Sequence, residues 1–417
     1  MTNNNHQLSQ NTANFVPLTP LSFLHRTADI YPQRESLIYN DLRYTWSQTR
    51  NRCTLVASSL ARRGIALNDT VSVFAFNTPE MFECHFAIPM AGAVLNTINT
   101  RVDAETVAYI IDHAESKAII VDRQLWPVLK EALNLCKLQP EIIIIDDSFA
   151  TEKPELPNDI KYSFYQELID QGDECFAWLA PIDEWQSLSL NYTSGTTGLP
   201  KGVLYHHRGA YLMGMGTGMS SPLPPHPRYL YTVPMFHCNG WGHVWTMTAA
   251  AATVICIRAF TPGSVFKLIE QHEVTHFGCA PIVLNMLANA PVAEQIKFDR
   301  TIHVITAGSP PPASVLESMN QFGFEIMHVY GLTETSGHIL QAAPQEDWQE
   351  KSIQKQAELK SRQGVRFAMT EQVDVIDTEN GESVPWDSTT MGEVAIRGNT
   401  VMKGYLKDPE ATDKAFQ

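Results

Sequence analysis

Short runs of apolar, largely β-branched residues recur along this chain, and longer amphipathic stretches separate them. Strands are expected where these runs stand, the clearest being residues 70–76, 117–122, 141–147, 252–260 and 302–308. A helix is expected after the first of them, because Thr78 can cap it and Pro79 suits its first turn. Strands that alternate with helices are typical of buried, largely parallel sheets. The sequence therefore predicts an α/β fold.

At 417 residues the chain is long enough for more than one hydrophobic core. We expect a loose polar tail over residues 1–16, and then two α/β subdomains with largely parallel sheets at 17–185 and 186–341. From residue 342 a charged stretch, expected to be helical with a solvated face, gives way to short alternating strands. This change predicts a smaller, β-rich subdomain over 342–417.

Composition narrows the class of ligand. The formal net charge of −15 opposes binding to nucleic acid or to anionic membranes, because both need a basic surface. No apolar run reaches the ~18 residues that span a bilayer, so no integral membrane segment is expected. The 7 cysteines form no C-x-x-C pair, which favours reduced thiols and a cytoplasmic protein. Small molecules are the expected partners, and a homodimer is left open.

The segment TSGTTGLPKG (193–202) follows an alternating strand and combines glycines, hydroxyls and one lysine without a carboxylate. Glycines let backbone N–H groups approach an anion, hydroxyls donate to phosphate oxygens, and lysine adds a point charge. It is not a Walker motif, because Pro200 stands where that motif has glycine and Gly202 follows the lysine. The composition predicts a phosphate-binding loop whose contacts come from Thr193, Ser194, Gly195, Thr196, Thr197, Gly198 and Lys201.

This loop is one of several motifs that occur in a fixed order, namely YTSGTTGLPKGV (192–203), AGSPPP (307–312), VYGLTET (329–335) and GEVAIRGNTVMKGYLKDPEAT (392–412). Together they resemble the signature motifs of the adenylate-forming superfamily, which includes the acyl-CoA synthetases. The resemblance covers nearly everything after the polar tail. It implies a two-step ligase that uses ATP, Mg²⁺ and CoA: a carboxylic acid attacks the α-phosphate of ATP, and a thiol then displaces AMP from the acyl-adenylate.

The resemblance also implies roles for single residues. The catalytic residues would be Thr193, Lys201, Thr333 and Glu334, and Glu334 would bind Mg²⁺, for which one protein carboxylate suffices. Tyr330 would lie against the adenine ring. The full set that binds ATP or AMP would be Thr193, Ser194, Gly195, Thr196, Thr197, Lys201, Gly308, Ser309, Pro310, Tyr330, Gly331 and Thr333. Because these motifs follow predicted strands, we expect them to meet at the carboxyl ends of the sheets.

The block VPMFHCNGWGHVW (233–245) borders the acyl channel in the family, so His237 and Trp241 are the candidates for binding the acid. Large apolar side chains in and beside this block indicate either a limited pocket for short-to-medium acids or plain core packing: Trp241, Trp245, Met235 and Met247.

Two other chemistries fit the same block less well. A zinc site made of His237, Cys238 and His243 lacks a fourth ligand and an established spacing. A catalytic pair of His237 and Cys238 is not expected, because adjacent side chains on a regular element point apart. We therefore expect Cys238 to be a packing residue.

The family continues beyond GYLKDPEATDKAF (404–416) into a mobile domain with a catalytic lysine, which nothing here matches. We therefore expect this chain to bind ATP and acid but to form adenylate slowly and thioester more slowly. The expected parent activity joins a fatty acid, short to medium in length, or a related carboxylate to CoA. The alternatives left open are an adenylation domain that loads a carrier protein, a luciferase-like oxygenase and a non-catalytic nucleotide-binding fragment.

Overall fold

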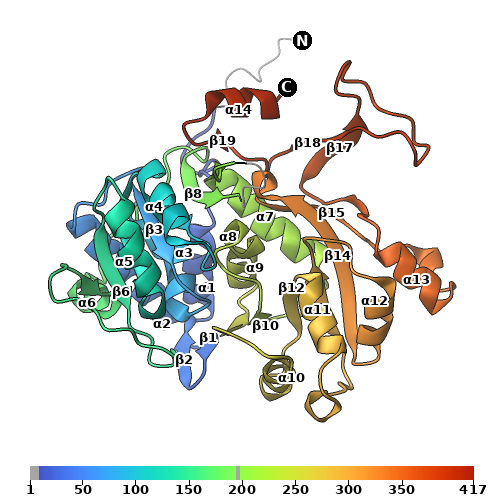
Figure 1. Ribbon diagram of the computed structural model, residues 1–417, viewed down its shortest axis with the longest axis horizontal. Coiled ribbons are helices and arrows are strands. Elements are labelled where there is room, and N and C mark those ends of the chain that lie inside the picture. The colour runs from blue at the N-terminus through green and yellow to red at the C-terminus, as the bar shows by residue number, and fades with distance from the viewer. Residues whose placement is uncertain (1–8, 194–197) are drawn as a thin grey trace.

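The computed structural model describes residues 9–193 and 198–417. Within this part of the chain, the strands form two large sheets and a separate hairpin, and helices lie between and outside the sheets (Figure 1). The expectation of an α/β fold with largely parallel sheets is confirmed.

The first sheet has the strand order β19-β9-β8-β4-β3-β5-β6-β7. From β8 to β7 the neighbouring strands are parallel, whereas β9 is antiparallel to β8 and β19 is antiparallel to β9. The strands are β3 (Thr70–Phe74), β4 (Val94–Thr97), β5 (Ser116–Asp122), β6 (Glu141–Ile145), β7 (Ser163–Phe164), β8 (Ser187–Tyr192), β9 (Gly202–His206) and β19 (Gly404–Tyr405).

The second sheet has the order β16-β15-β14-β13-β12-β10-β11-β1-β2. The strands from β14 to β1 in this order are parallel, and β16, β15 and β2 add antiparallel pairs at the two edges. The strands are β1 (Glu35–Tyr39), β2 (Leu42–Thr45), β10 (Arg228–Tyr231), β11 (Thr253–Cys256), β12 (His276–Cys279), β13 (Ile302–Thr306), β14 (Phe324–Leu332), β15 (Gly337–Gln341) and β16 (Val365–Arg366).

Helices make three layers around the two sheets (Figure 1). α4 and α5 cover the outer face of the first sheet, α1, α2, α3, α7 and α9 lie between the sheets, and α10, α11 and α12 cover the outer face of the second. The helices are α1 (Leu21–Ile30), α2 (Trp46–Arg62), α3 (Pro79–Met90), α4 (Ala104–His113), α5 (Trp126–Leu135), α6 (Tyr165–Gln171), α7 (His207–Ser220), α8 (Cys238–Trp241), α9 (His243–Ala249), α10 (Pro262–Gln271), α11 (Pro281–Ala288), α12 (Ala313–Asn320), α13 (Ile353–Lys360) and α14 (Pro409–Ala415).

Local sequence explains where several elements begin. Thr78 occupies the N-cap position of α3 and Pro79 is its first residue, as expected, although the Thr78 hydroxyl makes no capping hydrogen bond. Thr45 and Gln48 form a capping box that starts α2. The charged stretch after residue 342 is less helical than expected, because its helix begins only where the Ser352 hydroxyl accepts a hydrogen bond from the Lys355 N–H.

The two large sheets do not follow the order of the chain. β1 and β2 belong to the second sheet, while β8 and β9 close the first, so each sheet takes strands from both sides of residue 185. Arg258, which follows β11, ties the sheets together: its guanidinium lies 2.5 Å from Asp122 at the end of β5 and 3.0 Å from Asp147 after β6. This buried ion network fixes one sheet against the other near the carboxyl ends of their strands.

The β-rich remainder of the chain includes the hairpin of β17 (Thr370–Ile376) and β18 (Glu393–Gly398), which projects from the body of the molecule (Figure 1). β19 and α14 return to the edge of the first sheet. In the described residues, no helix has the length and apolar character needed to cross a bilayer.

Candidate active site

The predicted phosphate loop connects two antiparallel strands, β8 and β9, at the carboxyl end of β8. Two hydrogen bonds close its neck: the Thr193 N–H donates to the Lys201 carbonyl at 3.0 Å, and the Lys201 N–H donates to Thr193 Oγ1 at 3.1 Å. The Lys201 side chain is exposed. The other predicted phosphate contacts, Ser194, Gly195, Thr196 and Thr197, lie outside the described residues.

Helix α4 braces both sides of this loop. The Tyr109 hydroxyl donates to the Pro200 carbonyl at 3.2 Å, and His113 Nδ1 is hydrogen-bonded to the Tyr192 hydroxyl at 2.8 Å. The rings of Tyr109 and His113 stack on each other. The two ends of the phosphate loop are thus held by one rigid helix, which places Lys201 relative to the sheet.

The motif YGLTET occupies the end of β14 and a following 3-10 turn, η4 (Thr333–Thr335). The Tyr205 hydroxyl, from β9, donates to the Thr333 carbonyl at 2.5 Å, so the strand after the phosphate loop positions this turn. The Met402 N–H donates to the Glu334 carbonyl at 2.8 Å. Thr333 and Glu334, both half-buried, therefore lie beside the phosphate loop, as the sequence predicts.

Tyr405 joins the two charged residues of the site, and the sequence analysis gave it no role. Its hydroxyl donates to Glu334 Oε1 at 2.8 Å, and the Lys201 ammonium lies 4.8 Å from the centre of its ring. A lysine at this distance over an aromatic face makes a cation–π contact. The signal that could have pointed to Tyr405 is its place in the GYLKDPEAT motif. That motif indicated the family but assigned no role to any single residue in it.

The AGSPPP turn follows β13, which pairs in parallel with β14 so that Thr306 lies opposite His328. The turn is therefore beside Tyr330 at the start of the YGLTET motif. Gly308 has φ +97°, and a Cβ built on it would meet no atom within 4 Å, so its backbone borders open space. Ser309 and Pro310 are exposed, which leaves this edge free for a flat ligand such as a purine.

The segment that carries His237 adopts an unusual backbone. Residues 238–242 all have positive φ, with values of 43° at Cys238, 41° at Asn239 and 58° at Trp241, so α8 is a left-handed turn. This geometry brings neighbouring side chains together: Cys238 Sγ lies 3.9 Å from His237 Nε2 and 3.5 Å from Thr333 Oγ1. The expectation that the two side chains point apart is wrong, because it assumed a regular element.

Buried asparagines hold this left-handed turn in place. Asn239 is fully buried, and its Oδ1 accepts hydrogen bonds from Ser189 Oγ at 2.5 Å and from Asn191 Nδ2 at 2.6 Å. The Asn239 N–H donates to Asn191 Oδ1 at 2.9 Å. Ser189 and Asn191 belong to β8, the strand that enters the phosphate loop. One buried network thus joins the His237 turn to the phosphate-loop strand, and no sequence pattern indicated it.

Residues 24–406 match the family model described as AMP-binding enzyme. The chain belongs to this family. It is 45% identical over 415 residues to an acetate/butyrate–CoA ligase, peroxisomal, of Arabidopsis thaliana, covering 97% of this chain and 73% of that protein. It is also 45% identical over 413 residues to a 2-methylpropanoate–CoA ligase of Humulus lupulus, covering 98% of this chain and 74% of that protein. The chain spans about three quarters of the length of these relatives.

A solved structure supports the fold. The N-terminal domain of FACL13 from Mycobacterium tuberculosis superimposes with a TM-score of 0.78 at 24% sequence identity, covering 96% of this chain and 94% of that one. At this identity the likeness speaks for the fold alone.

The sequence left open whether the large apolar residues around His237 line an acyl pocket or simply pack in the core, and the structure treats them differently. Trp245, Met235 and Met247 are buried in the core between the sheets of this AMP-binding enzyme. Trp241 is only half-buried and packs against that core. Among the described residues, no three His, Cys, Asp or Glu side chains are grouped so that they could hold a metal ion.

The two side chains at this turn shift each other's pKa in this AMP-binding enzyme. Burial opposes ionisation of Cys238, but His237, Thr333 and Tyr205 together lower the pKa of its thiol. The charge of Cys238 and its hydrogen bond in turn raise the pKa of His237 against a smaller lowering effect of desolvation. Cys238 is therefore more than packing: it is a polar neighbour of the threonine expected to hold the α-phosphate.

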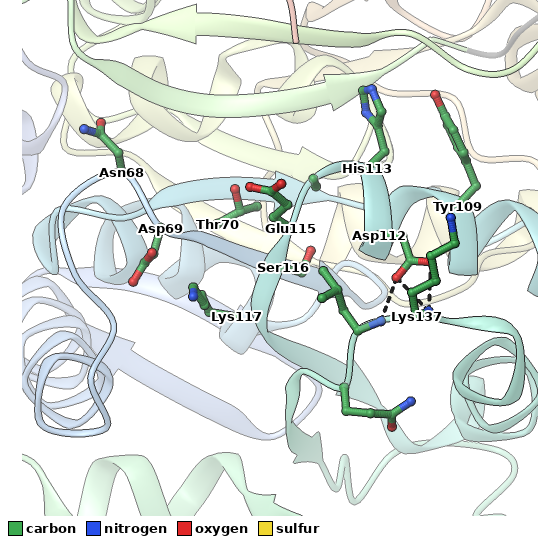
Figure 2. Close-up of a pocket in the computed structure, with 13 residues that line it drawn as sticks. Asn68, Asp69, Thr70, Tyr109, Asp112, His113, Glu115, Ser116, Lys117 and Lys137 are labelled. Atoms are coloured by element: carbon green, nitrogen blue, oxygen red, sulfur yellow. Dashed lines mark hydrogen bonds between the residues drawn. The ribbon is translucent and has the colours of Figure 1, made fainter. Parts of the chain in front are cut away.

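A surface hollow of about 790 Å³ lies at the C-terminal end of α4, and its lining includes Tyr109 and His113 (Figure 2). It borders the first residues of β3 and β5, the opposite strand ends from those that hold the motifs. Charges of both signs line it, and the Asp112 carboxylate already accepts hydrogen bonds from the N–H groups of Lys137 and Leu138. The hollow shares only its α4 wall with the motifs and is not part of the candidate site.

Proposed function

We propose that this AMP-binding enzyme activates a short-chain carboxylic acid with ATP and passes the acyl group to CoA. The observation that carries the proposal is that Lys201 and the adjacent pair Thr333 and Glu334, which lie far from Lys201 in the sequence, are brought to one place. Tyr405 contacts Lys201 and Glu334, and Tyr205 from β9 bonds the Thr333 carbonyl. A lysine, a hydroxyl and a carboxylate are the groups that a magnesium nucleotide needs at its phosphates. The open edge at Gly308 beside Tyr330 leaves room for the adenine ring.

In the first step, a carboxylate oxygen of the acid attacks the α-phosphorus and the bond to pyrophosphate breaks. Negative charge builds up on the phosphate oxygens, where the Lys201 ammonium and the Thr333 hydroxyl would stabilise it. Glu334 fits a magnesium ligand, because Tyr405 engages its Oε1 and no hydrogen bond is made to Oε2 in the described part of the chain. When bound, Mg²⁺ would neutralise charge on the phosphates. In the second step, the CoA sulfur attacks the acyl carbonyl and AMP leaves.

The size of the acid is proposed from two observations. The relatives are named for acetate, butyrate and 2-methylpropanoate, which are all small acids. Beside His237 and Trp241, the bulky side chains of Met235 and Trp245 are already packed in the core, which leaves them no freedom to open a deep channel. Acids of about two to four carbons are therefore preferred over long chains in this proposal.

The test is pyrophosphate release from ATP and Mg²⁺ with acetate, butyrate, 2-methylpropanoate, octanoate, palmitate or benzoate, followed by addition of CoA. Release should be highest with the short acids and should fall about 100-fold or more in Lys201→Ala and in Glu334→Ala. Lys267→Ala, at an exposed lysine on α10, is the matched control and should behave as the unchanged protein. Release that needs no acid, or equal release in all variants, would contradict the proposal.

Repeating the second step with a carrier protein in place of CoA tests the identity of the acceptor. A thioester that forms on a carrier-protein phosphopantetheine arm but not on CoA would replace CoA as the proposed acceptor. The slow turnover expected of the 417-residue chain stays a prediction, as do a homodimer and a cytoplasmic location.

A further inference from the structure

We propose that Tyr405 is a positioning residue that keeps Lys201 and Glu334 apart and correctly placed for magnesium ATP. The inference rests on the proposed function, in which both charged residues act on the nucleotide. It starts from two contacts of one side chain: the hydroxyl donates to Glu334 Oε1 at 2.8 Å, and the ring face carries the Lys201 ammonium at 4.8 Å.

The backbone fixes Tyr405 firmly beside the phosphate loop. β19 pairs antiparallel with β9, so that Tyr405 lies opposite Val203, two residues after Lys201. Hydrogen bonds from the neighbouring residues continue this pairing, since the Lys403 N–H donates to the Leu204 carbonyl at 2.8 Å and the Leu406 N–H donates to the Gly202 carbonyl at 2.7 Å. The Tyr405 N–H donates to Thr412 Oγ1 at 3.0 Å on α14.

The ring and the hydroxyl act on different partners. The hydroxyl restrains rotation of the Glu334 carboxylate and leaves its Oε2 available to a cation. The ring holds the Lys201 ammonium without a negative charge, so that the lysine remains free to exchange this contact for a phosphate. Among the described residues, Lys201 and Glu334 form no salt bridge with each other. Direct pairing of these opposite charges would oppose nucleotide binding, and the intervening tyrosine prevents it.

The two contacts can be separated by substitution. Tyr405→Phe keeps the ring under Lys201 but removes the hydrogen bond to Glu334. Tyr405→Ala removes both and lets Lys201 approach Glu334. Tyr162→Phe is the matched control, because Tyr162 is also half-buried but meets Phe164 edge to face, away from these motifs. Glu334→Gln reports whether the carboxylate itself responds to the cation.

The experiment is calorimetric titration of each protein with ATP, once with Mg²⁺ and once with EDTA. Tyr405→Phe should bind metal-free ATP normally. The factor by which Mg²⁺ increases its affinity for ATP should be about tenfold smaller than in the unchanged protein, because a hydrogen bond to a charged group is lost. Tyr405→Ala should lose this gain and also bind metal-free ATP several-fold more weakly. Tyr162→Phe should change neither, and equal melting temperatures would exclude a general loss of structure.

Two results overturn the inference and can be told apart. If Glu334→Gln loses the Mg²⁺ gain while Tyr405→Phe keeps it, the carboxylate acts as proposed but the tyrosine does not position it. If Glu334→Gln keeps the full Mg²⁺ gain, the role of Glu334 in the proposed function fails, and the role of Tyr405 fails with it.

Discussion

Replacing Asn239 by alanine should destabilise the protein, because the side chain of Asn239 is the centre of the buried network under the His237 turn. The change leaves the Ser189 hydroxyl and the Asn191 amide without their acceptor at a fully buried position. Each unpaired buried donor costs roughly 1–3 kcal/mol. Alanine at φ 41° and ψ 51° adds about 1 kcal/mol, since asparagine tolerates the left-handed region better.

The expected total is a loss of roughly 3–7 kcal/mol in the free energy of unfolding, which is a large part of what a protein of ordinary stability possesses. Asn239→Gly should recover about 1 kcal/mol of it, because glycine removes the backbone strain but not the lost hydrogen bonds. Asn51→Ala, at an exposed position of α2, should stay within about 0.5 kcal/mol of the unchanged protein.

Urea unfolding followed by tryptophan fluorescence measures these differences, and the KM for the acid shows whether the turn has loosened. The Michaelis constant should rise in Asn239→Ala, since the same turn carries His237. A loss of less than about 1 kcal/mol for Asn239→Ala would show that the network does not stabilise the turn. If the alanine and glycine variants are equally stable, the backbone strain assigned to alanine is refuted, whereas the effect of the lost hydrogen bonds is not.

Two further predictions concern burial and close packing. Burial lowers the pKa of His243 to about 3 and that of His338 to about 4, so both side chains are neutral in the folded protein. Above pH ~6.5 they are neutral in the unfolded chain too, and the full stability of the protein is present. Below that pH the unfolded chain takes up more protons than the folded protein does. The free energy of unfolding, measured in urea at pH 7.5, 6 and 5, should therefore fall by up to about 1.4 kcal/mol per pH unit for each histidine. A free energy of unfolding that does not change with pH would contradict this. Gly331→Ala should weaken ATP binding more than tenfold in calorimetry, because its Cβ would lie 2.0 Å from the Gly337 carbonyl oxygen, whereas Gly218→Ala, with only ordinary contacts, should bind ATP normally.

The apolar runs were enough to predict the buried strands β3, β5, β6, β11 and β13, since side chains buried on both faces of a parallel strand leave a local pattern. The helix cap at Thr78 and the hydroxyl-rich loop before Lys201 are local in the same sense. The bounds were less well predicted: the helix expected after residue 342 is short, because its start depends on a single Ser352 cap.

The sequence by itself determined the α/β class, the family motifs and most of the residues proposed to bind the nucleotide, because covalent neighbours set periodicity, turn chemistry and motif spacing. Only the tertiary structure decided that Cys238 meets His237, since a run of positive φ values is held by Asn191 and other residues of distant strands. Only the tertiary structure placed Tyr405 between Lys201 and Glu334. Such contacts follow from the register of strands that are remote in the chain, and no local pattern specifies that register.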